Sequence, residues 1–160
     1  MIHAPVTIRT AATTDLEAIN RVVERAVMSW DLPERVKRLS LPVYRYTEAD
    51  LAALETVVAV TAKDLVGVAA WEHADAADLP GSGDALLLHG LYVDPRHNGQ
   101  GIGTQLLQAT EAAAREQGMT GVVVKAQRDA AGFFKARGYR AMEVTNAGRD
   151  YAHRLWKAVD

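Results

Sequence analysis

The stretch from Leu91 to Leu107, LYVDPRHNGQGIGTQLL, constrains most strongly what this chain can fold into. An apolar run ends at Val93, and Pro95 stops it because proline has no backbone N–H to give to a strand ladder. Three glycines follow at alternate positions, Gly99, Gly101 and Gly103. The apolar spacing of an amphipathic helix begins directly after them. The sequence therefore predicts a strand, a glycine-rich turn and a helix, in that order.

That order favours the binding of a phosphate. Glycine lets the backbone approach a ligand closely, and the free N–H groups and the dipole of a helix N-terminus face the anion. Two known phosphate loops do not match. A Walker A loop needs a lysine after its glycines, and a dinucleotide fingerprint needs a third glycine where this chain has Thr104 or Leu106. We expect a phosphate-bearing ligand of another kind, and a turn without a ligand is the alternative.

The same stretch resembles the first signature of the GNAT superfamily, the acyl-CoA-dependent N-acyltransferases. In that signature, a strand ending in Val-Asp-Pro leads into Gln/Arg-x-x-Gly-x-Gly/Ala and a long helix. The loop positions of the signature are occupied here by Asn98, Gly99, Gln100, Gly101, Ile102 and Gly103. Asn98 stands where the family usually has Gln or Arg, and the other positions agree with the signature.

A second stretch, residues 127–139, resembles the second GNAT signature, Asn-x-x-Ala-x-x-(Leu/Phe)-Tyr-x-x-x-Gly-(Phe/Tyr). The positions that fit are Ala130, Phe133, Gly138 and Tyr139. Gln127 replaces the family's Asn and keeps an amide side chain. Phe134 replaces the family's Tyr and therefore has no hydroxyl. The resemblance covers about Val57 to Tyr139, with both signatures in the family's order.

The resemblance implies a fold, a co-substrate and the residues that bind it. The implied fold is α/β (α+β), with a mixed, mostly antiparallel central sheet of about six to seven strands, helices on both faces and a single domain over residues 1–160. The implied co-substrate is acetyl-CoA, without a metal. The implied binding positions are Leu91, Tyr92, Val93, Asn98, Gly99, Gln100, Gly101, Ile102, Gly103, Thr104, Gln127 and Phe134. In this scheme a bulge at the end of the central strand polarises the thioester, the loop amides hold the pyrophosphate, and Gln127 holds a pantetheine amide.

Acyl transfer to an amine needs a base for the amine and a proton for the leaving thiolate. Glu72, at a strand end, and His89, which interrupts an apolar row, are the candidate bases. Their alternatives are a solvated strand end and a hydrogen-bonded core histidine. In the family, a tyrosine at the position of Phe134 protonates the thiolate. Tyr139 and Tyr151 are available instead, as are a water or departure of the thiolate without help.

Two functional hypotheses follow. The first is an N-acetyltransferase that moves the acetyl group of acetyl-CoA to a primary amine by direct attack in a ternary complex. The chain has no cysteine, so an acetyl-cysteine relay is excluded. The second is a non-catalytic acyl-CoA-binding or sensory domain, which the missing hydroxyl at Phe134 suggests.

Composition restricts the partners. The formal net charge is −2 with mixed signs, so no basic field attracts nucleic acid or a membrane. No apolar run approaches the roughly 20 residues of a membrane span, and the N-terminus does not resemble a secretory signal. The absence of cysteine fits a cytoplasmic protein, and the five histidines lack zinc-ligand spacing. Many GNAT members form dimers, so a homodimer is one expected assembly, although the sequence indicates no interface.

Apolar periodicity and turn residues predict the elements. Strands are predicted at Val6–Arg9, Val57–Thr61, Leu65–Trp71, Ala85–Val93, Val122–Val124, Tyr139–Val144 and about Tyr151–Lys157. Helices are predicted from a capping box at Thr14–Glu17 to about Trp30, and at Glu34–Leu39, Thr47–Leu54, Thr104–Gln117 and about Asp129–Arg137. Pro42 is predicted to lie in a loop.

The region before the second strand suggests an acceptor site. Its aromatic residues are Trp30, Tyr44 and Tyr46, and its basic residues are Arg35, Lys37, Arg38 and Arg45. This mixture favours a small acceptor that carries a carboxylate or an aromatic group. The alternative is a solvated basic helix with ordinary core aromatics. The sequence leaves both a small-molecule amine and a peptide N-terminus open as acceptors.

Overall fold

The described residues form two compact units. The computed structural model describes residues 5–75, 78–79, 83–126, 130–142 and 154–159. The first unit comprises Met1–Ala70 and Gly90–Ala109, and the second comprises Trp71–His89 and Thr110–Asp160. The chain passes from one unit to the other within two strands and one helix, so each unit holds part of the sheet.

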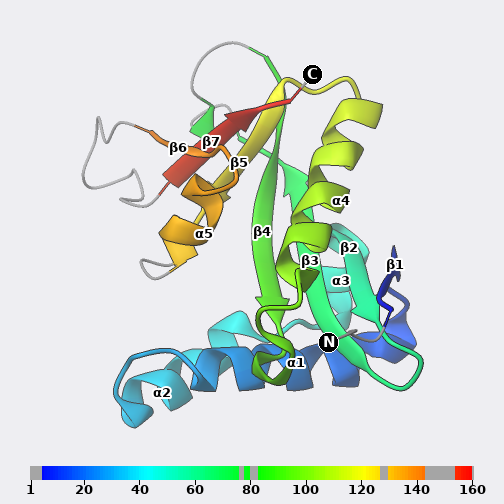
Figure 1. The fold of residues 1–160 in the computed structure, drawn as a ribbon, viewed down its shortest axis with the longest axis vertical. Coiled ribbons are helices and arrows are strands. Elements are labelled where there is room, and N and C mark those ends of the chain that lie inside the picture. The colour runs from blue at the N-terminus through cyan, green and yellow to red at the C-terminus, as the bar shows by residue number, and fades with distance from the viewer. Residues whose placement is uncertain (1–4, 76–77, 80–82, 127–129, 143–153, 160) are drawn as a thin grey trace. The chain divides into compact units, whose positions relative to one another are not determined.

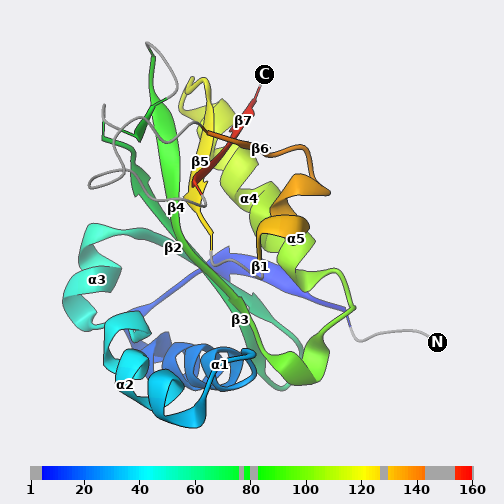
Figure 2. The ribbon, with the colours of Figure 1, turned by 90° about the vertical axis from the view of Figure 1, so that its left-hand side faces the viewer.

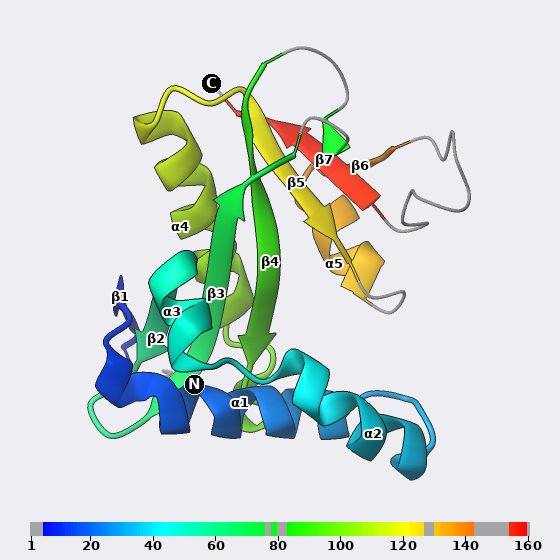
Figure 3. The ribbon, with the colours of Figure 1, turned by 180° about the vertical axis from the view of Figure 1, so that it is seen from behind.

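Among the described residues, seven strands form a sheet with the order β1-β2-β3-β4-β5-β7-β6. Their bounds are Thr7–Thr10 (β1), Glu55–Val60 (β2), Leu65–His73 (β3), Ala85–Val93 (β4), Gly121–Lys125 (β5), Arg140–Ala141 (β6) and Arg154–Ala158 (β7). Strands β1 and β2, β5 and β7, and β6 and β7 pair antiparallel, whereas β4 and β5 pair in parallel. Figure 3 shows β3 and β4 side by side. The predicted mixed α/β sheet is confirmed.

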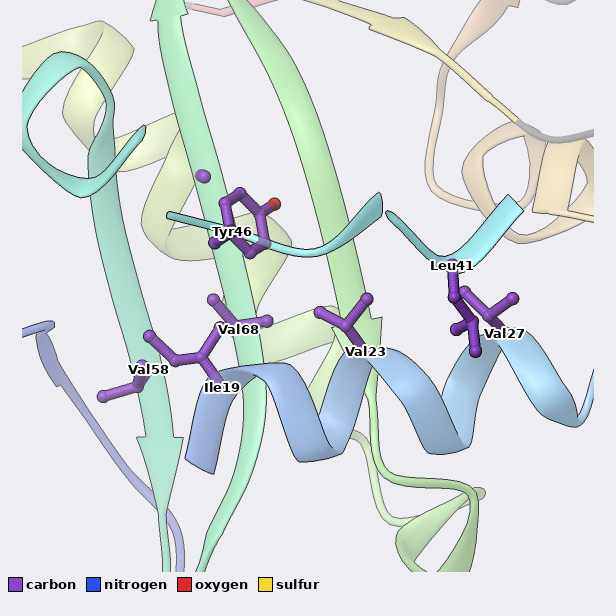
Figure 4. Close-up of a cluster of buried hydrophobic side chains, with 8 residues drawn as sticks. Ile19, Val23, Val27, Leu41, Tyr46, Val58 and Val68 are labelled. Atoms are coloured by element: carbon purple, nitrogen blue, oxygen red, sulfur yellow. The ribbon is translucent and has the colours of Figure 1, made fainter. Parts of the chain in front are cut away.

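Helix α1 covers one face of the sheet in the first unit (Figure 2). The helices are Leu16–Met28 (α1), Glu34–Tyr44 (α2), Glu48–Ala53 (α3), Ile102–Glu116 (α4) and Ala131–Lys135 (α5). Ile19, Val23 and Val27 recur at helical spacing and are fully buried. They pack in one cluster with Val58 of β2 and Val68 of β3 (Figure 4).

The start of α4 packs on the opposite face of β3. Successive side chains of a strand point to opposite faces, so Gly67 faces away from the cluster that contains Val68. A Cβ atom at Gly67 would lie 2.9 Å from Leu106 Cδ1 and 3.1 Å from Ile102 Cγ2. Glycine at this position therefore lets α4 approach the strand closely. The prediction of helices on both faces is confirmed.

The second unit is built around β5. This strand lies between β4 and β7, with Ala85 opposite Gly121 and Leu88 opposite Val124. Its residues 121–124 are all buried, as the β-branched run predicts. Helix α5 follows and ends at Lys135, and the turn after it contains Gly138, whose φ of +94° is the left-handed conformation expected of a glycine after a helix. Figure 1 shows β5, β7 and β6 next to α5.

Two hydrogen bonds join the ends of β3 and β4, and between these bonds β4 contains one residue more than β3. The N–H of Ala74 donates to the carbonyl of Ala85 (2.9 Å), and the N–H of Asp94 donates to the carbonyl of Val66 (2.8 Å). Between these bonds β4 advances nine residues and β3 advances eight. A regular antiparallel ladder keeps the two counts equal, so β4 contains the extra residue of a β-bulge.

The prediction that Pro42 lies in a loop is wrong, because α2 continues through it to Tyr44. Proline removes only its own N–H from the helix, and this loss falls in the last turn. The preceding residue, Leu41, is buried in the cluster against α1. Packing of that side chain outweighs the local preference, which is a common way for tertiary structure to override a sequence pattern.

The predicted capping box at Thr14–Glu17 is also wrong. Residues Thr13–Asp15 form a 3₁₀ turn, and α1 begins at Leu16. Asp15 Oδ2 accepts the N–H of Ala12 at 2.7 Å. The acidic side chain that bonds to a backbone N–H three residues earlier is therefore that of Asp15 and not that of Glu17. Glu17 instead pairs with Arg21 on the exposed side of α1.

Candidate functional site

The glycine loop joins the end of β4 to the start of α4 and lies wholly in the first unit. Gly99 and Gly101 have φ values of +78° and +79°, whereas no described residue other than glycine has a positive φ. The sign of φ therefore alternates along Gly99, Gln100 and Gly101. Alternation of this kind turns successive N–H groups toward the same side, as in anion-binding nests. A Cβ atom at either glycine would meet nothing within 4 Å. These two positions therefore need glycine for its backbone conformation and not for space.

The loop presents unpaired backbone donors. In the part of the chain that the structure describes, no hydrogen bond is made by the amides of Gly99, Gln100, Gly101, Ile102 and Gly103. The first bond into α4 runs from the N–H of Gln105 to the carbonyl of Gly101, at 3.1 Å. The positive end of the dipole of this 15-residue helix lies at the same place. These donors fit a pyrophosphate.

Asp94 anchors the turn that precedes the loop. Its fully buried carboxylate accepts hydrogen bonds from Arg96 Nη2 (2.8 Å), from the N–H of Arg96 (3.0 Å) and from Arg25 Nη1 of α1 (3.0 Å). Burial by itself raises the pKa of Asp94, but the hydrogen bonds and positive charges of the two arginines outweigh it. The pKa is therefore held below its ordinary value. Asp94 and its partners keep the end of β4 fixed relative to α1.

Sequence reasoning missed this role of Asp94 and named the residue only as part of a signature. A signal was available, because an aspartate followed directly by proline is the pattern of an N-cap and the first residue of a helix. The structure shows that arrangement, with Pro95–His97 as a 3₁₀ turn and Asp94 as its N-cap. The partner Arg25 comes from a distant part of the chain, and no local pattern points to it.

The end of β4 contains the three residues whose backbone was implied to polarise the thioester. Leu91, Tyr92 and Val93 are half-buried, which leaves them partly accessible at the strand end. The extra residue in β4 takes backbone groups of this strand out of the regular ladder. Their implied role stays a prediction.

Both candidate bases lie in the second unit, on neighbouring strands. Glu72 is exposed near the end of β3, as a solvated strand end would be. His89 is exposed on β4, so it is not the buried core histidine that was its alternative. Exposure leaves both side chains able to reach a ligand in solution, and their function as bases stays a prediction.

The second signature places its aromatic residues in the core of the second unit. Phe134 is 4% exposed and meets Phe133 and Tyr139 edge to face, with ring centroids 5.1 and 5.6 Å away. Position 134 is thus an interior packing position. Gln127 and Tyr151 lie outside the described residues.

Tyr139 is held by buried Glu111, which is paired with the partly buried Lys157. Its hydroxyl donates to Glu111 Oε2 at 2.8 Å, and Lys157 Nζ lies 3.2 Å from the same oxygen. Burial and the hydrogen bond to Glu111 raise the pKa of Tyr139, so the hydroxyl is protonated at neutral pH. Its proton is directed at Glu111, and donation elsewhere requires that this bond be broken.

The basic residues of the acceptor region are mostly paired. Lys37 Nζ donates to the carbonyls of Met28 (2.8 Å) and Trp30 (3.2 Å) at the end of α1. Arg38 pairs with Glu34, and Arg45 pairs with Glu24. The aromatic residues of the region contact one another, because the rings of Trp30 and Tyr44 meet edge to face with centroids 5.2 Å apart. Tyr46 is buried in the cluster against α1.

Two other kinds of feature are absent from the described residues. These residues contain no group of three or more histidine, aspartate or glutamate side chains arranged to hold a metal ion. None of the described helices has the length and hydropathy of a membrane span.

A family model matches most of the chain. The model of the acetyltransferase (GNAT) family matches residues 24–139, a range that includes the glycine loop and α5. No curated protein matches the chain in sequence.

Solved structures of the same family share the fold. A GCN5-related N-acetyltransferase from Rhodopseudomonas palustris is 24% identical, with a TM-score of 0.75 and coverage of 99% of each chain. The PaiA N-acetyltransferase of Thermoplasma acidophilum, in complex with coenzyme A, is 16% identical, with a TM-score of 0.75 and coverage of 95% of this chain and 97% of its own. A GNAT acetyltransferase of Brucella melitensis, in complex with acetyl-CoA, is 20% identical, with a TM-score of 0.67 and coverage of 98% and 89%.

Proposed function

Because this chain belongs to the GNAT acetyltransferase family, we propose that it transfers the acetyl group of acetyl-CoA to a primary amine by direct attack in a ternary complex. The observation that carries this proposal is the nest at Gly99–Gly103, whose unpaired amides lie at the start of α4. Two solved structures with the same fold contain coenzyme A or acetyl-CoA. Residues 1–160 are proposed to act as one such domain.

Backbone groups of the first unit are the main part of the proposed co-substrate site. The amides from Gly99 to Thr104 hold the pyrophosphate, and the side chains of Asn98 and Gln100 border it. The backbone of Leu91, Tyr92 and Val93 receives the pantetheine arm and polarises the carbonyl. Gln127 and Phe134 complete the proposed binding set. Acetyl-CoA supplies an acetyl group activated as a thioester.

The remaining residues handle protons. A free amine must be neutral to attack, and its ordinary pKa is near 10.4, so Glu72 or His89 accepts its proton directly or through water. A carbon–nitrogen bond forms while the carbon–sulfur bond breaks, and the sulfur leaves as a thiolate. Tyr139 is the proposed proton donor to that thiolate. The chain has no cysteine, which supports direct transfer without an acetylated enzyme.

The acceptor is proposed to be a small-molecule amine or a peptide N-terminus, and no nucleic acid or membrane takes part. A homodimer is the proposed assembly. The proposed location is cytoplasmic, which the absence of cysteine supports.

A calorimetric titration with acetyl-CoA tests the proposal without knowledge of the acceptor. We expect micromolar binding that is lost in Gly101→Glu, because a side chain strains the nest and its carboxylate repels the pyrophosphate. Gly118→Glu is the matched control: Gly118 has a φ of +71° and open space around its Cβ position, as Gly101 does, but lies after α4. Absence of binding by folded wild-type protein would refute the proposal.

A non-catalytic acyl-CoA-binding or sensory domain is the second candidate function. The specific observation in its favour is Phe134, which is buried among aromatic rings and cannot donate a proton. Release of free coenzyme A in the presence of a panel of primary amines separates the two. Binding of acetyl-CoA with no amine-dependent release would support the second candidate.

A further inference from the structure

Tyr46, between α2 and α3, carries a hydroxyl that no other described residue uses. The residue is only 5% exposed. Its backbone makes hydrogen bonds, but its hydroxyl has no partner in the part of the chain that the structure describes. The Tyr46 oxygen is not one of the fully buried side-chain atoms that lack a partner, so it keeps some contact with solvent. Burial raises the pKa of Tyr46, so the group stays protonated and can both donate and accept.

A dedicated contact fixes the position of Tyr46. Asn20 Oδ1 of α1 accepts the N–H of Tyr46 at 2.8 Å, and Asn20 Nδ2 donates to its carbonyl at 2.9 Å. Both polar atoms of the Asn20 side-chain amide thereby bind the backbone of Tyr46, 26 positions later in the chain. In Figure 4 the oxygen of Tyr46 points away from the apolar side chains of α1. The ring is buried, and the hydroxyl end is directed out of the apolar cluster.

Gly90 of β4 makes room for this hydroxyl. A Cβ atom at Gly90 would lie 2.5 Å from the Tyr46 hydroxyl oxygen and 2.9 Å from Tyr92 Cε2. The rings of Tyr46 and Tyr92 meet edge to face, with centroids 6.4 Å apart. Any larger residue at position 90 would displace the hydroxyl. The group is therefore held over the strand immediately before Leu91, where the proposed carbonyl-polarising segment begins.

The hydroxyl and α4 lie on opposite sides of the sheet in the first unit. Tyr46 belongs to the cluster of α1 with Val68. Gly67, the neighbour of Val68, faces Ile102 and Leu106 of α4 instead. The glycine loop leads into α4, so a ligand held by that loop and a ligand held by Tyr46 can meet at the strand end without sharing a binding surface.

The surroundings of Tyr46 are mainly aromatic, and the charge that acts on its hydroxyl is the negative charge of Asp50, which contributes, after burial, to its raised pKa. Tyr92 lies against it, and burial with the proximity of Tyr44 raises the pKa of Tyr92, so its hydroxyl is neutral as well. The nearby cations Lys37 and Arg45 are paired, with backbone carbonyls and with Glu24 respectively. Such a site offers hydrogen bonds and ring faces and does not select for a carboxylate.

We propose that the Tyr46 hydroxyl binds the nitrogen of the acceptor, accepting one N–H of the neutral amine, and that the acceptor is a primary amine with an apolar or aromatic substituent. This rests on the proposed function. The hydrogen bond orients the nitrogen lone pair toward the strand end, and no proton moves to or from Tyr46. Tyr44 and Tyr92 pack against the substituent.

Two probes test the proposal, 2-phenylethylamine and n-hexylamine, with wild type and Tyr46→Phe compared. We expect the KM for the amine to rise about tenfold or more, the value for loss of one hydrogen bond of roughly 1.4 kcal/mol. The dissociation constant of acetyl-CoA should not change. The melting temperature should change little, because the hydroxyl makes no hydrogen bond within the described residues. A purely structural role for the hydroxyl predicts the same melting behaviour with no change in KM.

Thr56→Val is the matched control. Thr56 of β2 is also 5% exposed, and its hydroxyl has no partner among the described residues. Its removal should leave the KM for both amines unchanged. Asn20→Ala should raise the amine KM as Tyr46→Phe does, since it frees the backbone of Tyr46, and should lower stability too.

Calorimetry of each amine with the coenzyme A-saturated protein separates the outcomes. Equal amine affinity in wild type and Tyr46→Phe overturns this inference while the proposed function stands. So does failure of both amines to bind wild type at millimolar concentration when acetyl-CoA binds normally. If acetyl-CoA itself does not bind, the proposed function falls, and the same amine titrations without coenzyme A decide this inference.

Discussion

Asp94 is the residue on which the geometry before the glycine loop depends. Its carboxylate joins Arg25 of α1 to Arg96 of the following turn, and its own N–H joins β4 to β3. A buried carboxylate is costly unless it is well paired. Here the pairs come from elements that are far apart in the chain. Loss of the charge should therefore affect the fold and the loop together.

Asp94→Asn should lower the free energy of unfolding by about 1–3 kcal/mol, because charge-assisted hydrogen bonds to a buried acceptor are weakened. It should also weaken acetyl-CoA binding, since the turn before the nest is no longer fixed. Urea unfolding and calorimetry measure the two effects. Asp15→Asn is the control: Asp15 pairs with Arg9 at 2.8 Å, remote from the loop. Equal losses of acetyl-CoA affinity in both variants would contradict the prediction.

Phe134→Tyr tests whether the missing hydroxyl limits catalysis. The substitution restores the family's proton donor, so kcat should rise if departure of the thiolate is slow. The new hydroxyl enters an interior position that is 4% exposed, and without a partner it should lower the free energy of unfolding by about 1–3 kcal/mol. Amine-dependent release of coenzyme A and thermal melting measure both effects. Phe133→Tyr, at the neighbouring half-buried ring, is the control for a general effect of added hydroxyls.

At the scale of elements, α2 is defined by its contacts with α1. Lys37 is 7% exposed, and its ammonium group donates to two carbonyls at the end of α1. The last carbonyls of a helix have no partners within it, so cations near this end are stabilising. Leu41, one turn later, is buried in the same cluster. These contacts extend α2 through Pro42.

Lys37→Met should lower the free energy of unfolding by about 1–2 kcal/mol, because the aliphatic stem is kept while the hydrogen bonds to α1 are lost. Arg38→Met is the matched control, since its side chain is 74% exposed and pairs with exposed Glu34. The cost there should be below about 0.5 kcal/mol. Chemical denaturation of both variants measures the difference, and equal costs would refute the capping role of Lys37.

At the scale of the whole molecule, ionisable groups in both units determine how stability depends on pH. Hydrogen bonds and charges of arginines lower the pKa of Asp94, and hydrogen bonding to Arg9 lowers that of Asp15. Burial raises the pKa of Tyr46 and of Tyr139. The aspartates thus favour folding as anions, and the tyrosines favour it as neutral phenols.

The free energy of unfolding should be highest, as far as these groups decide it, between about pH 4 and pH 10. Below about pH 4 the unfolded chain takes up protons more readily than the folded aspartates, so stability falls. Above about pH 10 the unfolded tyrosines ionise first, and stability falls again. Urea titrations over pH measure both limbs. An Asp15→Asn, Asp94→Asn double variant should show a weaker acid limb and an unchanged alkaline limb.

The predicted elements and the observed ones agree best where the pattern is long. The central strand Ala85–Val93 is found at its predicted bounds, and α4 begins two residues before the predicted Thr104. The errors at Pro42 and at Thr14–Glu17 occur where one turn of local chemistry competes with packing. Alternation could not decide between the two interpretations of His89, a candidate base and a core histidine, because an extra residue in β4 breaks the regular alternation of faces along the strand.

The sequence by itself determined the glycine loop, its place between strand and helix, and the family to which these belong. Such features are local, since positive φ values and helix starts depend on neighbours in the chain. Tertiary structure alone decided that Asp94 meets Arg25, that Asn20 holds Tyr46, and that Gly90 admits the Tyr46 hydroxyl. Each of these contacts joins distant segments. Their partners are chosen by how the elements pack, and no local pattern records that choice.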